Sequence, residues 1–344
     1  MVKILVAGAA GFIGSNFVRR LLAAGGHEVV VLDSLTYAGN MENLAGLDAS
    51  NGFSFVHGSI CDPAVVKAAV QGCDAIVNFA AETHVDRSIE NPAVFIESNV
   101  LGTMVLIQAA VGAGLRLLQV STDEVYGSLG EEGLFDEDWP LDPSSPYAAS
   151  KASADMLIGA SARTYGLDAV ITRCGNNYGP RQFPEKLIPL LIANAMAGET
   201  LPIYGDGLNV RDWIHVDDHC DALRLVLEKG QSGRVYNVSA VGELTNREVC
   251  SRILAALGKP ESLMRHVDDR PGHDRRYALD PSRLQNELGW KANVAFDEGL
   301  STTIEWYQAN SAWLDNVRSG EYRGYYERMY ASRLESGTTV AEED

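Results

Sequence analysis

Positive charge is scarce in this sequence, which has 28 Lys and Arg residues against 46 Asp and Glu and a formal net charge of −18. A protein without an excess of cations is a poor candidate for binding nucleic acid, because bound phosphates must be neutralised by Lys and Arg side chains. An anionic small molecule can still bind where the few cations gather locally. The 344 residues are 46% hydrophobic and 22% charged, which is an ordinary globular composition and excludes wholesale disorder.

Paired cysteines and long apolar runs are also missing. The cysteines are odd in number, far apart and without a CxxC pair, and stand at Cys61, Cys73, Cys174, Cys220 and Cys250. This pattern excludes a disulfide framework and a structural zinc site, so we expect reduced thiols, no bound metal and a cytoplasmic protein. No uninterrupted apolar run approaches the ~20 residues of a membrane span. The apolar start of the chain is better explained by a buried strand than by a signal peptide, so we expect neither membrane nor nucleic acid among the partners.

Short apolar runs alternate with helical periodicity over the first half of the chain. Continuous apolar strands separated by helices are typical of a parallel sheet that helices cover on both faces. We expect strands over residues 4–7, 28–32, 53–57, 75–79, 115–121, 169–173 and 235–238, and helices over 13–22, 62–70, 92–111, 144–165, 216–227, 244–257, 281–288 and 296–313. The predicted fold class is α/β, a Rossmann-type doubly wound parallel sheet with a smaller mixed α/β lobe that binds substrate.

The pattern loosens after residue 178, where prolines interrupt it at Pro180, Pro184, Pro189 and Pro202. We expect a cofactor-binding domain over residues 1–178, to which residues 211–239 return. The substrate-binding lobe is expected over 179–210 and 240–334. The polar and acidic tail, 335–344, is expected to fray.

Three glycines, Gly8, Gly11 and Gly14, follow the first predicted strand and open the first predicted helix. Glycines permit a tight turn and let the backbone approach a pyrophosphate, which the helix N-terminus attracts through its free N–H groups and dipole. Asp33 ends the second predicted strand, where a carboxylate can bind the adenosine ribose hydroxyls and would repel a 2′-phosphate. The sequence therefore predicts NAD rather than NADP. Packing of helix on strand without a ligand is the alternative.

Tyr147 and Lys151 lie one helical turn apart and share a helix face. A nearby ammonium favours the phenolate and is expected to lower the pKa of Tyr147 from ~10 toward the working pH. Such a tyrosine can accept a hydroxyl proton while hydride leaves the same carbon for a nicotinamide. Lys151 can also bind the nicotinamide ribose. A chance pairing on the surface is the alternative.

Two adjacent carboxylates, Asp123 and Glu124, follow the fifth predicted strand, at the sheet edge where such folds bind ligands. Neighbours in a strand point to opposite faces, so both acids reach one substrate only if the strand has already ended. They can act as general acid and general base if their surroundings separate their pKa values. The alternative is that one of them only caps or pairs structurally.

These motifs together resemble a known family. The GxxGxxG spacing, Asn78-Phe-Ala-Ala-Glu82, the YxxxK pair and Tyr178-Gly-Pro180 are similar to the extended short-chain dehydrogenase/reductase family. The Asp-Glu pair after Ser121-Thr122 narrows the resemblance to the nucleotide-sugar 4,6-dehydratases, and among them to the branch that acts on dTDP-glucose. Related 4-epimerases typically carry small residues at these two positions. Further similar motifs lie at 84–88, 173–180, 182–189, 201–205, 211–213, 270–275 and 322–328.

The resemblance implies an NAD-dependent lyase that forms dTDP-4-keto-6-deoxyglucose from dTDP-glucose. It implies transient oxidation at C4, loss of water across C5 and C6, and return of the hydride to C6. Thr122 is implied to bond the substrate, Asp123 to protonate the departing 6-hydroxyl, and Glu124 to remove the C5 proton, beside the catalytic Tyr147 and Lys151. A homodimer is also implied.

The resemblance further implies two sets of binding residues. Those for NAD are Gly8, Gly11, Phe12, Ile13, Gly14, Asp33, Ser34, Thr36, Ser59, Ile60, Phe79, Ala80, Ala81, Thr83, Ser98, Tyr147, Lys151 and Asn177. Those for the nucleotide sugar are His84, Arg87, Thr122, Asn176, Lys186, Leu187, Pro202, Ile203, Tyr204, Arg211, Asn246, Arg270 and His273. Although cations are scarce, Arg211, Arg270, Arg275 and Arg276 gather in a few motifs, as a diphosphate requires. Salt bridges to the abundant acids are the alternative for each of these arginines.

Two departures and two alternatives remain. Ser59 stands where the family usually has an Asp that bonds the adenine amine, which puts an adenine contact there in question. Gly175 stands where Ser or Cys is expected, without consequence for the chemistry. A 4-epimerase or decarboxylase acting on a UDP-sugar is the competing enzyme, which the acids Asp123 and Glu124 disfavour. A non-catalytic NAD-sensing protein is disfavoured by the intact Tyr147–Lys151 pair.

Overall fold

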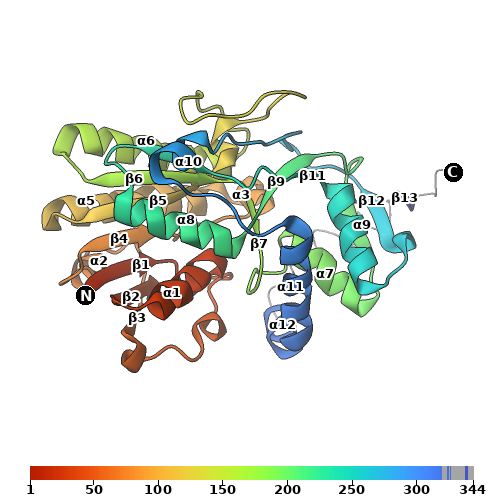
Figure 1. Ribbon diagram of the computed structural model, residues 1–344, viewed down its shortest axis with the longest axis horizontal. Helices are drawn as coiled ribbons and strands as arrows, with labels where there is room; N and C mark the ends of the chain where they lie inside the picture. Colours follow the sequence, from red (N-terminus) through yellow and green to blue (C-terminus); the bar gives the residue numbers. More distant parts are fainter. Residues whose placement is uncertain (320–323, 325, 327–337, 340–344) are drawn as a thin grey trace.

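A seven-stranded parallel sheet forms the centre of the protein (Figure 1). The computed structural model describes residues 1–319, 324, 326 and 338–339. The strand order is β10-β6-β5-β4-β1-β2-β3, with β1 (Val2–Ala7), β2 (His27–Asp33), β3 (Phe53–His57), β4 (Ala75–Asn78), β5 (Arg116–Thr122), β6 (Ala169–Cys174) and β10 (Val235–Val238). The order reverses direction between β1 and β4, and folds of this kind bind ligands at that point. The predicted fold class is therefore confirmed.

Both faces of the sheet are buried, as the continuous apolar strands predict. Ile4 and Val6 of β1 belong to one hydrophobic cluster, whereas Leu5 and Ala7 belong to another. The first cluster includes side chains of α1 (Phe12–Ala24), α8 (Val216–Lys229) and α10 (Ser282–Leu288). The second includes side chains of α2 (Pro63–Ala69), α5 (Thr103–Ala113) and α6 (Pro146–Tyr165). Figure 1 shows α1 and α8 side by side over the first face.

A continuous helix over Pro92–Ala113 joins α4 (Pro92–Phe95), the π-helical segment η3 (Ile96–Gly102) and α5. By length and composition it is the one helix among the described residues that could cross a membrane. Its Leu106 and Ile107 instead pack in the second hydrophobic cluster. π-Helical turns occur often at functional sites, and in η3 Asn99 bonds both the backbone of Glu82 and the Ser150 hydroxyl.

Among the described residues, the second lobe contains two small sheets and four helices. One sheet has the order β11-β9-β7, and the other has the order β13-β12-β8. Their bounds are β7 (Asn176–Tyr178), β8 (Leu201–Tyr204), β9 (Val210–His215), β11 (Glu243–Thr245), β12 (Met264–Val267) and β13 (Thr338–Thr339). The helices are α7 (Leu187–Ala197), α9 (Asn246–Leu257), α11 (Phe296–Ala309) and α12 (Ser311–Val317). A third core, which includes Trp213, Ile253 and Tyr307, holds them together.

The structure corrects the sequence analysis in this lobe. The single helix expected over 296–313 is broken at Asn310, whose φ of −119° and ψ of 42° are not helical, and the break lets Trp306 contact Trp313. Pro189 does not interrupt a helix, because it occupies the first turn of α7, where N–H groups have no intrahelical acceptor. Pro202 lies in β8, an edge strand that tolerates it. Of the tail 335–344, the structure describes only Thr338 and Thr339, which pair with β12.

Candidate active site

In the glycine turn after β1, the backbone at Gly8 and Gly14 lies very close to the backbone of other residues. Gly8 has φ of +76°, and a Cβ there would lie 2.4 Å from the Ala80 nitrogen. A Cβ on Gly14 would lie 2.7 Å from the Ala9 Cα. Gly11 begins α1 without a side-chain cap, so the first N–H groups of the helix are left for a ligand. This is a typical site for a pyrophosphate.

Asp33 connects the end of β2 to this turn. Its Oδ2 accepts a hydrogen bond from the Ala10 N–H at 2.8 Å, and its Oδ1 accepts one from the Leu35 N–H at 2.8 Å. Burial raises the pKa of Asp33, and the two backbone bonds oppose that rise. The carboxylate is therefore fixed by the backbone at the position where an adenosine ribose is expected.

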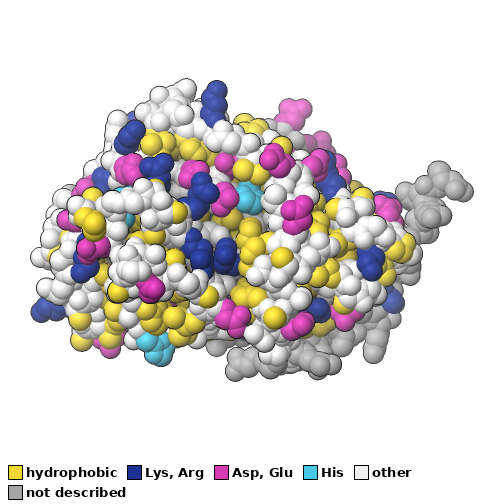
Figure 2. Space-filling model, turned by 60° about the horizontal axis from the view of Figure 1, so that its bottom comes forward, with side chains coloured by type: hydrophobic (Ala, Val, Ile, Leu, Met, Phe, Trp, Pro, Cys, Tyr) yellow, Lys and Arg dark blue, Asp and Glu magenta, His cyan; other side chains and the backbone are white. Residues whose placement is uncertain are grey.

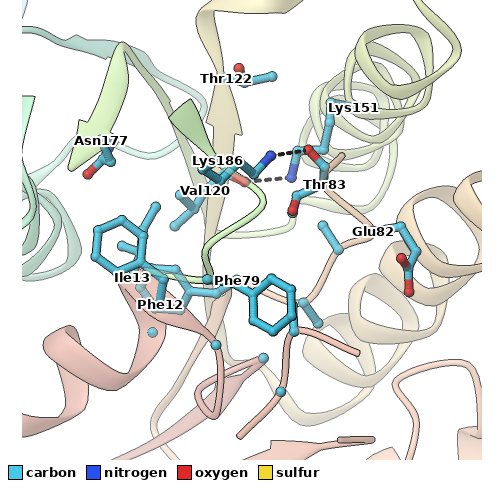
Figure 3. A pocket seen from close by; sticks show the side chains of 18 of the residues that line it. Phe12, Ile13, Phe79, Glu82, Thr83, Val120, Thr122, Lys151, Asn177 and Lys186 are labelled. Carbon is cyan, nitrogen blue, oxygen red and sulfur yellow. Dashed lines mark hydrogen bonds between the residues drawn. The ribbon is translucent and has the colours of Figure 1, made fainter. Parts of the chain in front are cut away.

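A single large cleft runs along the carboxyl edge of the sheet, and every residue predicted to bind NAD lines it. Figure 3 shows Phe12 and Ile13 from the start of α1, Phe79 from the segment after β4, and Asn177 from β7 around this cleft. The Ser59 hydroxyl also lines it and accepts a hydrogen bond from the Cys61 N–H at 3.1 Å. The open helix N-terminus, the glycine cradle and the carboxylate of Asp33 fit NAD. Among the described residues, no group of His, Cys, Asp and Glu side chains is placed to hold a metal ion.

The five residues predicted to be catalytic meet in the same cleft. Tyr147 and Lys151 lie on α6, whose N-terminus is capped by the Ser145 hydroxyl. Lys151 Nζ donates a hydrogen bond to the Val120 carbonyl at 2.7 Å (Figure 3). The expected lowering of the Tyr147 pKa is not found: burial raises the pKa of Tyr147 well above ~10, and the Glu124 carboxylate raises it further.

The two acids lie on a turn, as the chemistry requires. β5 ends at Thr122, and Asp123–Tyr126 form the 3₁₀ helix η4. The Thr122 hydroxyl accepts a hydrogen bond from the Glu124 N–H and donates one to Asp123 Oδ1 at 3.2 Å. Asp123 Oδ2 is buried without a partner among the described residues. Both acids therefore line the cleft rather than opposite faces of a strand.

A second cavity continues from the first beyond Glu124, Asn176 and Lys186, which line both. Of the residues predicted to bind the nucleotide sugar, it is lined by His84, Asn176, Lys186, Leu187, Pro202, Ile203, Tyr204, Arg211, Asn246, Arg270 and His273. Figure 2 shows Lys and Arg side chains gathered near the middle of one face, although the chain is acidic overall. Arg270 Nη1 and Asn246 Oδ1 are buried here without partners in the described part of the chain. An unpaired buried donor on a cation indicates that an anionic ligand belongs in this cavity.

Three predicted arginines lie elsewhere. Arg87 lines a separate hollow: its Nε lies 3.1 Å from Glu185 Oε2, and its guanidinium lies 3.9 Å from the centre of the Tyr37 ring. Arg275 pairs with Asp206 and is 52% exposed, and Arg276 pairs with Glu243. Arg275 and Arg276 therefore form salt bridges with acidic residues outside the two cavities, as the alternative in the sequence analysis describes.

The sequence analysis missed some residues of the second cavity. Asp86 accepts a hydrogen bond from the Tyr204 hydroxyl at 3.1 Å and lies 3.9 Å from Arg270 Nε. Trp213 lines both cavities with its indole N–H buried and without a partner among the described residues. Asp86 and Trp213 lie inside the motifs at 84–88 and 211–213, which carry the family resemblance. Their place in these motifs was the signal in the sequence that could have identified them.

The parallel sheet, the glycine turn and the Tyr147–Lys151 pair define an NAD-dependent enzyme of the extended short-chain dehydrogenase/reductase class. The profile of a family described as GDP-mannose 4,6 dehydratase matches residues 5–303. The chain is 52% identical to a dTDP-glucose 4,6-dehydratase of Streptomyces niveus, over 92% of this chain and 96% of that protein. It is 46% identical to dTDP-glucose 4,6-dehydratase 1 of Escherichia coli K12, over 96% of this chain and 100% of that protein.

Solved structures give the same result. DesIV, a dTDP-glucose 4,6-dehydratase of Streptomyces venezuelae solved with NAD bound, superposes with a TM-score of 0.90 at 53% identity, over 92% of this chain and 100% of that one. A UDP-glucose 4-epimerase of Thermus thermophilus, also with NAD, gives 0.84 at 34% identity, over 90% and 100%. The chain belongs to the family of dTDP-glucose 4,6-dehydratases.

Proposed function

We propose that this protein dehydrates dTDP-glucose to dTDP-4-keto-6-deoxyglucose. The observation that carries this proposal is the presence of two carboxylates, Asp123 and Glu124, beside the Tyr147–Lys151 pair in one cleft. An oxidation needs only the Tyr–Lys pair, whereas an elimination of water needs an acid and a base in addition. The activity named for the relatives supports the same reaction.

Oxidation at C4 begins the sequence. Tyr147 removes the proton of the C4 hydroxyl, and Lys151, held by the Val120 carbonyl, would bind the ribose of the cofactor. When bound, NAD supplies the hydride acceptor and a cationic ring whose charge favours the Tyr147 phenolate. The resulting C4 carbonyl acidifies the hydrogen on C5, which prepares the elimination.

Elimination then uses the two acids. Glu124 takes the C5 proton, and Asp123 gives its own proton to the departing C6 hydroxyl, so that one water leaves. From a bound NAD the hydride would return to C6 while Glu124 gives its proton back to C5. Exchange with solvent would pass the proton gained by Tyr147 to Asp123, so that the whole site ends as it began. Burial and neighbouring carboxylates raise the pKa of Asp123, which favours the protonated form that a general acid needs.

The second cavity holds the nucleoside diphosphate in this proposal. Lys186, Arg211 and Arg270 supply the positive charge for the diphosphate. Pro202, Ile203 and Tyr204 provide an apolar wall for the base. Asn246, whose amide oxygen has no partner among the residues that the structure describes, lines the same cavity.

A panel of nucleotide glucoses tests the proposal. The purified protein is incubated with dTDP-, UDP- or GDP-glucose, and the products are identified by mass spectrometry. We expect loss of one water from dTDP-glucose and little from the others, without consumption of free NAD. Conversion to a 4-epimer of unchanged mass, or reaction of the UDP-sugar alone, would overturn the proposal and favour the epimerase.

We also propose that the protein is a homodimer in the cytoplasm. Exposed apolar side chains follow the outer surface of the helices packed with α6, namely Val94, Ile96, Leu101 and Val111, and Met156 lies on α6 itself. Leu101 is 56% and Met156 57% exposed, and a second copy of the chain would cover them. The five cysteines are free thiols, which suits a reducing compartment.

Light scattering after size-exclusion chromatography tests the dimer. The parent chain is expected at twice its chain mass, and a Leu101→Glu/Met156→Lys variant at one chain mass. Leu208→Glu, which places a charge on another exposed leucine, serves as the control and should leave the dimer intact. A monomeric parent chain would refute this part of the proposal.

A further inference from the structure

A buried ion pair lies behind the catalytic lysine. Tyr147, Lys151 and Asp155 follow one another at four-residue spacing on α6, so they share one face of the helix. Asp155 is 3% exposed, and its Oδ2 accepts a hydrogen bond from Arg173 Nε of β6 at 2.9 Å. Asp155 Oδ1 has no partner within direct hydrogen-bond distance in the described part of the structure. Burial raises the pKa of this carboxyl group, and both Lys151 and the Ser121 hydroxyl lower it.

The pair continues into a buried polar chain. Arg173 Nη1 donates a hydrogen bond to the Tyr126 hydroxyl at 3.0 Å, and that hydroxyl donates to Asn237 Oδ1 at 2.8 Å. Tyr126 is the last residue of η4, the turn that begins with Asp123. The chain therefore links the helix that carries out oxidation to the turn that carries the two acids.

The surroundings of Lys151 contain few charges that could hold its proton. Burial lowers its pKa, and only Asp155 on α6 and Cys174 on β6 oppose that effect among the described residues. Tyr147 is the other titratable group on this face of α6. The helices α3 (Val85–Glu90), α4 and α5 also pack against α6 but bring no charge that moves the pKa of Lys151. β5 contributes the Val120 carbonyl, which is neutral.

We propose that Asp155 is a positioning residue for Lys151: it is the buried counter-charge that keeps the ammonium protonated and aimed into the cleft. Asp155 touches neither substrate nor cofactor, since it does not line either cavity. Arg173 fixes the carboxylate from the opposite side through the bond to Oδ2. The effect on oxidation rests on the proposed function. The effect on cofactor binding by Lys151 does not.

The pH dependence of the first oxidation tests the proposal. Formation of bound NADH from dTDP-glucose in a single turnover is measured from neutral to alkaline pH. The rate should fall at high pH when Lys151 loses its proton. In Asp155→Asn this fall is expected about one pH unit or more lower than in the parent chain, because an opposite charge beside a buried ammonium typically raises its pKa by that amount. Asp155→Glu, which keeps the charge, should restore much of the alkaline range.

A double variant separates this role from a purely structural one. Asp155→Asn leaves the Arg173 guanidinium buried without its partner, which can unfold the protein. Asp155→Leu/Arg173→Met removes both charges, a replacement that folds commonly tolerate. If Asp155 only neutralises Arg173, the oxidation rate of the double variant falls at the same high pH as in the parent chain, that is, its alkaline limb is that of the parent, and the proposal is overturned. If Asp155 serves Lys151, the double variant keeps the shifted limb.

Two controls complete the test. Tyr126→Phe breaks the polar chain but keeps the Asp155 charge, and Asp168→Asn breaks the exposed Arg116–Asp168 pair on the same sheet. Neither should move the alkaline limb, and a shift in Tyr126→Phe equal to that in the double variant would contradict the proposal.

NAD affinity without sugar gives an independent readout. The double variant should bind NAD about tenfold more weakly than the parent at alkaline pH, and equal affinity would count against the role of Asp155. A parent chain that binds NAD but does not oxidise dTDP-glucose would refute the proposed function and leave the NAD readout decisive for Asp155.

Discussion

Asp123 and Glu124 are adjacent on one turn, yet carboxylates lead among the charged neighbours of Asp123 and cations among those of Glu124. Burial raises the pKa of Asp123 well above its usual range, and the carboxylates of Glu124 and Asp212 raise it further. Burial also raises the pKa of Glu124, but the cations Arg270, Lys186 and Arg211 oppose that rise. These surroundings favour the protonated form more strongly in Asp123 than in Glu124, which is how a pair of carboxyl groups divides acid and base work.

Loss of the acid should separate oxidation from elimination. Asp123→Asn is expected to oxidise the substrate but to release water ~10²–10⁴-fold more slowly, because a positioned acid typically contributes that much. In a single turnover, absorbance of bound NADH should rise and persist. In Tyr147→Phe no such rise should appear, because no base remains for the C4 hydroxyl proton. Dehydration at the parent rate by Asp123→Asn would mean that Glu124 or a water is the acid.

Loss of the base should be visible at C5. Glu124→Gln is expected to slow the exchange of the C5 hydrogen with deuterium oxide by ~10²–10⁴-fold, since the amide cannot accept the proton. Mass spectrometry of recovered substrate and product reports the exchange. Exchange at the parent rate in Glu124→Gln would assign the base to another group.

The charge of Asp33 should exclude NADP. Asp33→Asn keeps one acceptor oxygen, enough for only one of the Ala10 and Leu35 N–H groups, and it removes the charge that repels a 2′-phosphate. We expect the parent chain to bind NAD much more tightly than NADP, and the variant to narrow that difference by about tenfold or more. Equal binding of both cofactors by the parent chain, measured by fluorescence titration, would refute this role.

Stability should fall in acid because of two buried histidines. Burial lowers the pKa of both His84 and His219 to about 3, whereas in the unfolded chain a histidine titrates near ~6.5. The folded pKa values lie below the unfolded ones, so the stabilisation is complete above ~6.5 and is lost as pH falls toward ~3.

Each of these histidines should cost about 2 kcal/mol of unfolding free energy at about pH 5. Urea unfolding at about pH 8 and about pH 5 measures the loss of unfolding free energy between the two pH values. In His84→Gln this loss should be smaller than in the parent chain by about 2 kcal/mol, the contribution of one histidine. His57→Gln, at an exposed ring, serves as the control. An equal loss in His84→Gln and the parent chain would contradict this account.

The sequence predicted the Rossmann domain better than the second lobe, for physical reasons. Strands such as β1 are apolar throughout because both faces are buried, and Asp62 caps α2 as its position before Pro63 predicts. In the second lobe, strands such as β9 contain Arg211 and Asp212, whose burial depends on partners far along the chain. Local patterns carry no information on those partners. The position of Arg276 was likewise decided by Glu243, a distant residue.

The most direct test of the reaction follows one hydrogen. dTDP-glucose deuterated at C4 is converted by the protein, and the product is examined by NMR and mass spectrometry. If hydride leaves C4 and returns to C6 within the same cleft, the deuterium will be found on C6 of a product that has lost one water, and C5 will carry a hydrogen from solvent. Deuterium that remains on C4 of a product of unchanged mass, or that appears in released NADH, would contradict the account.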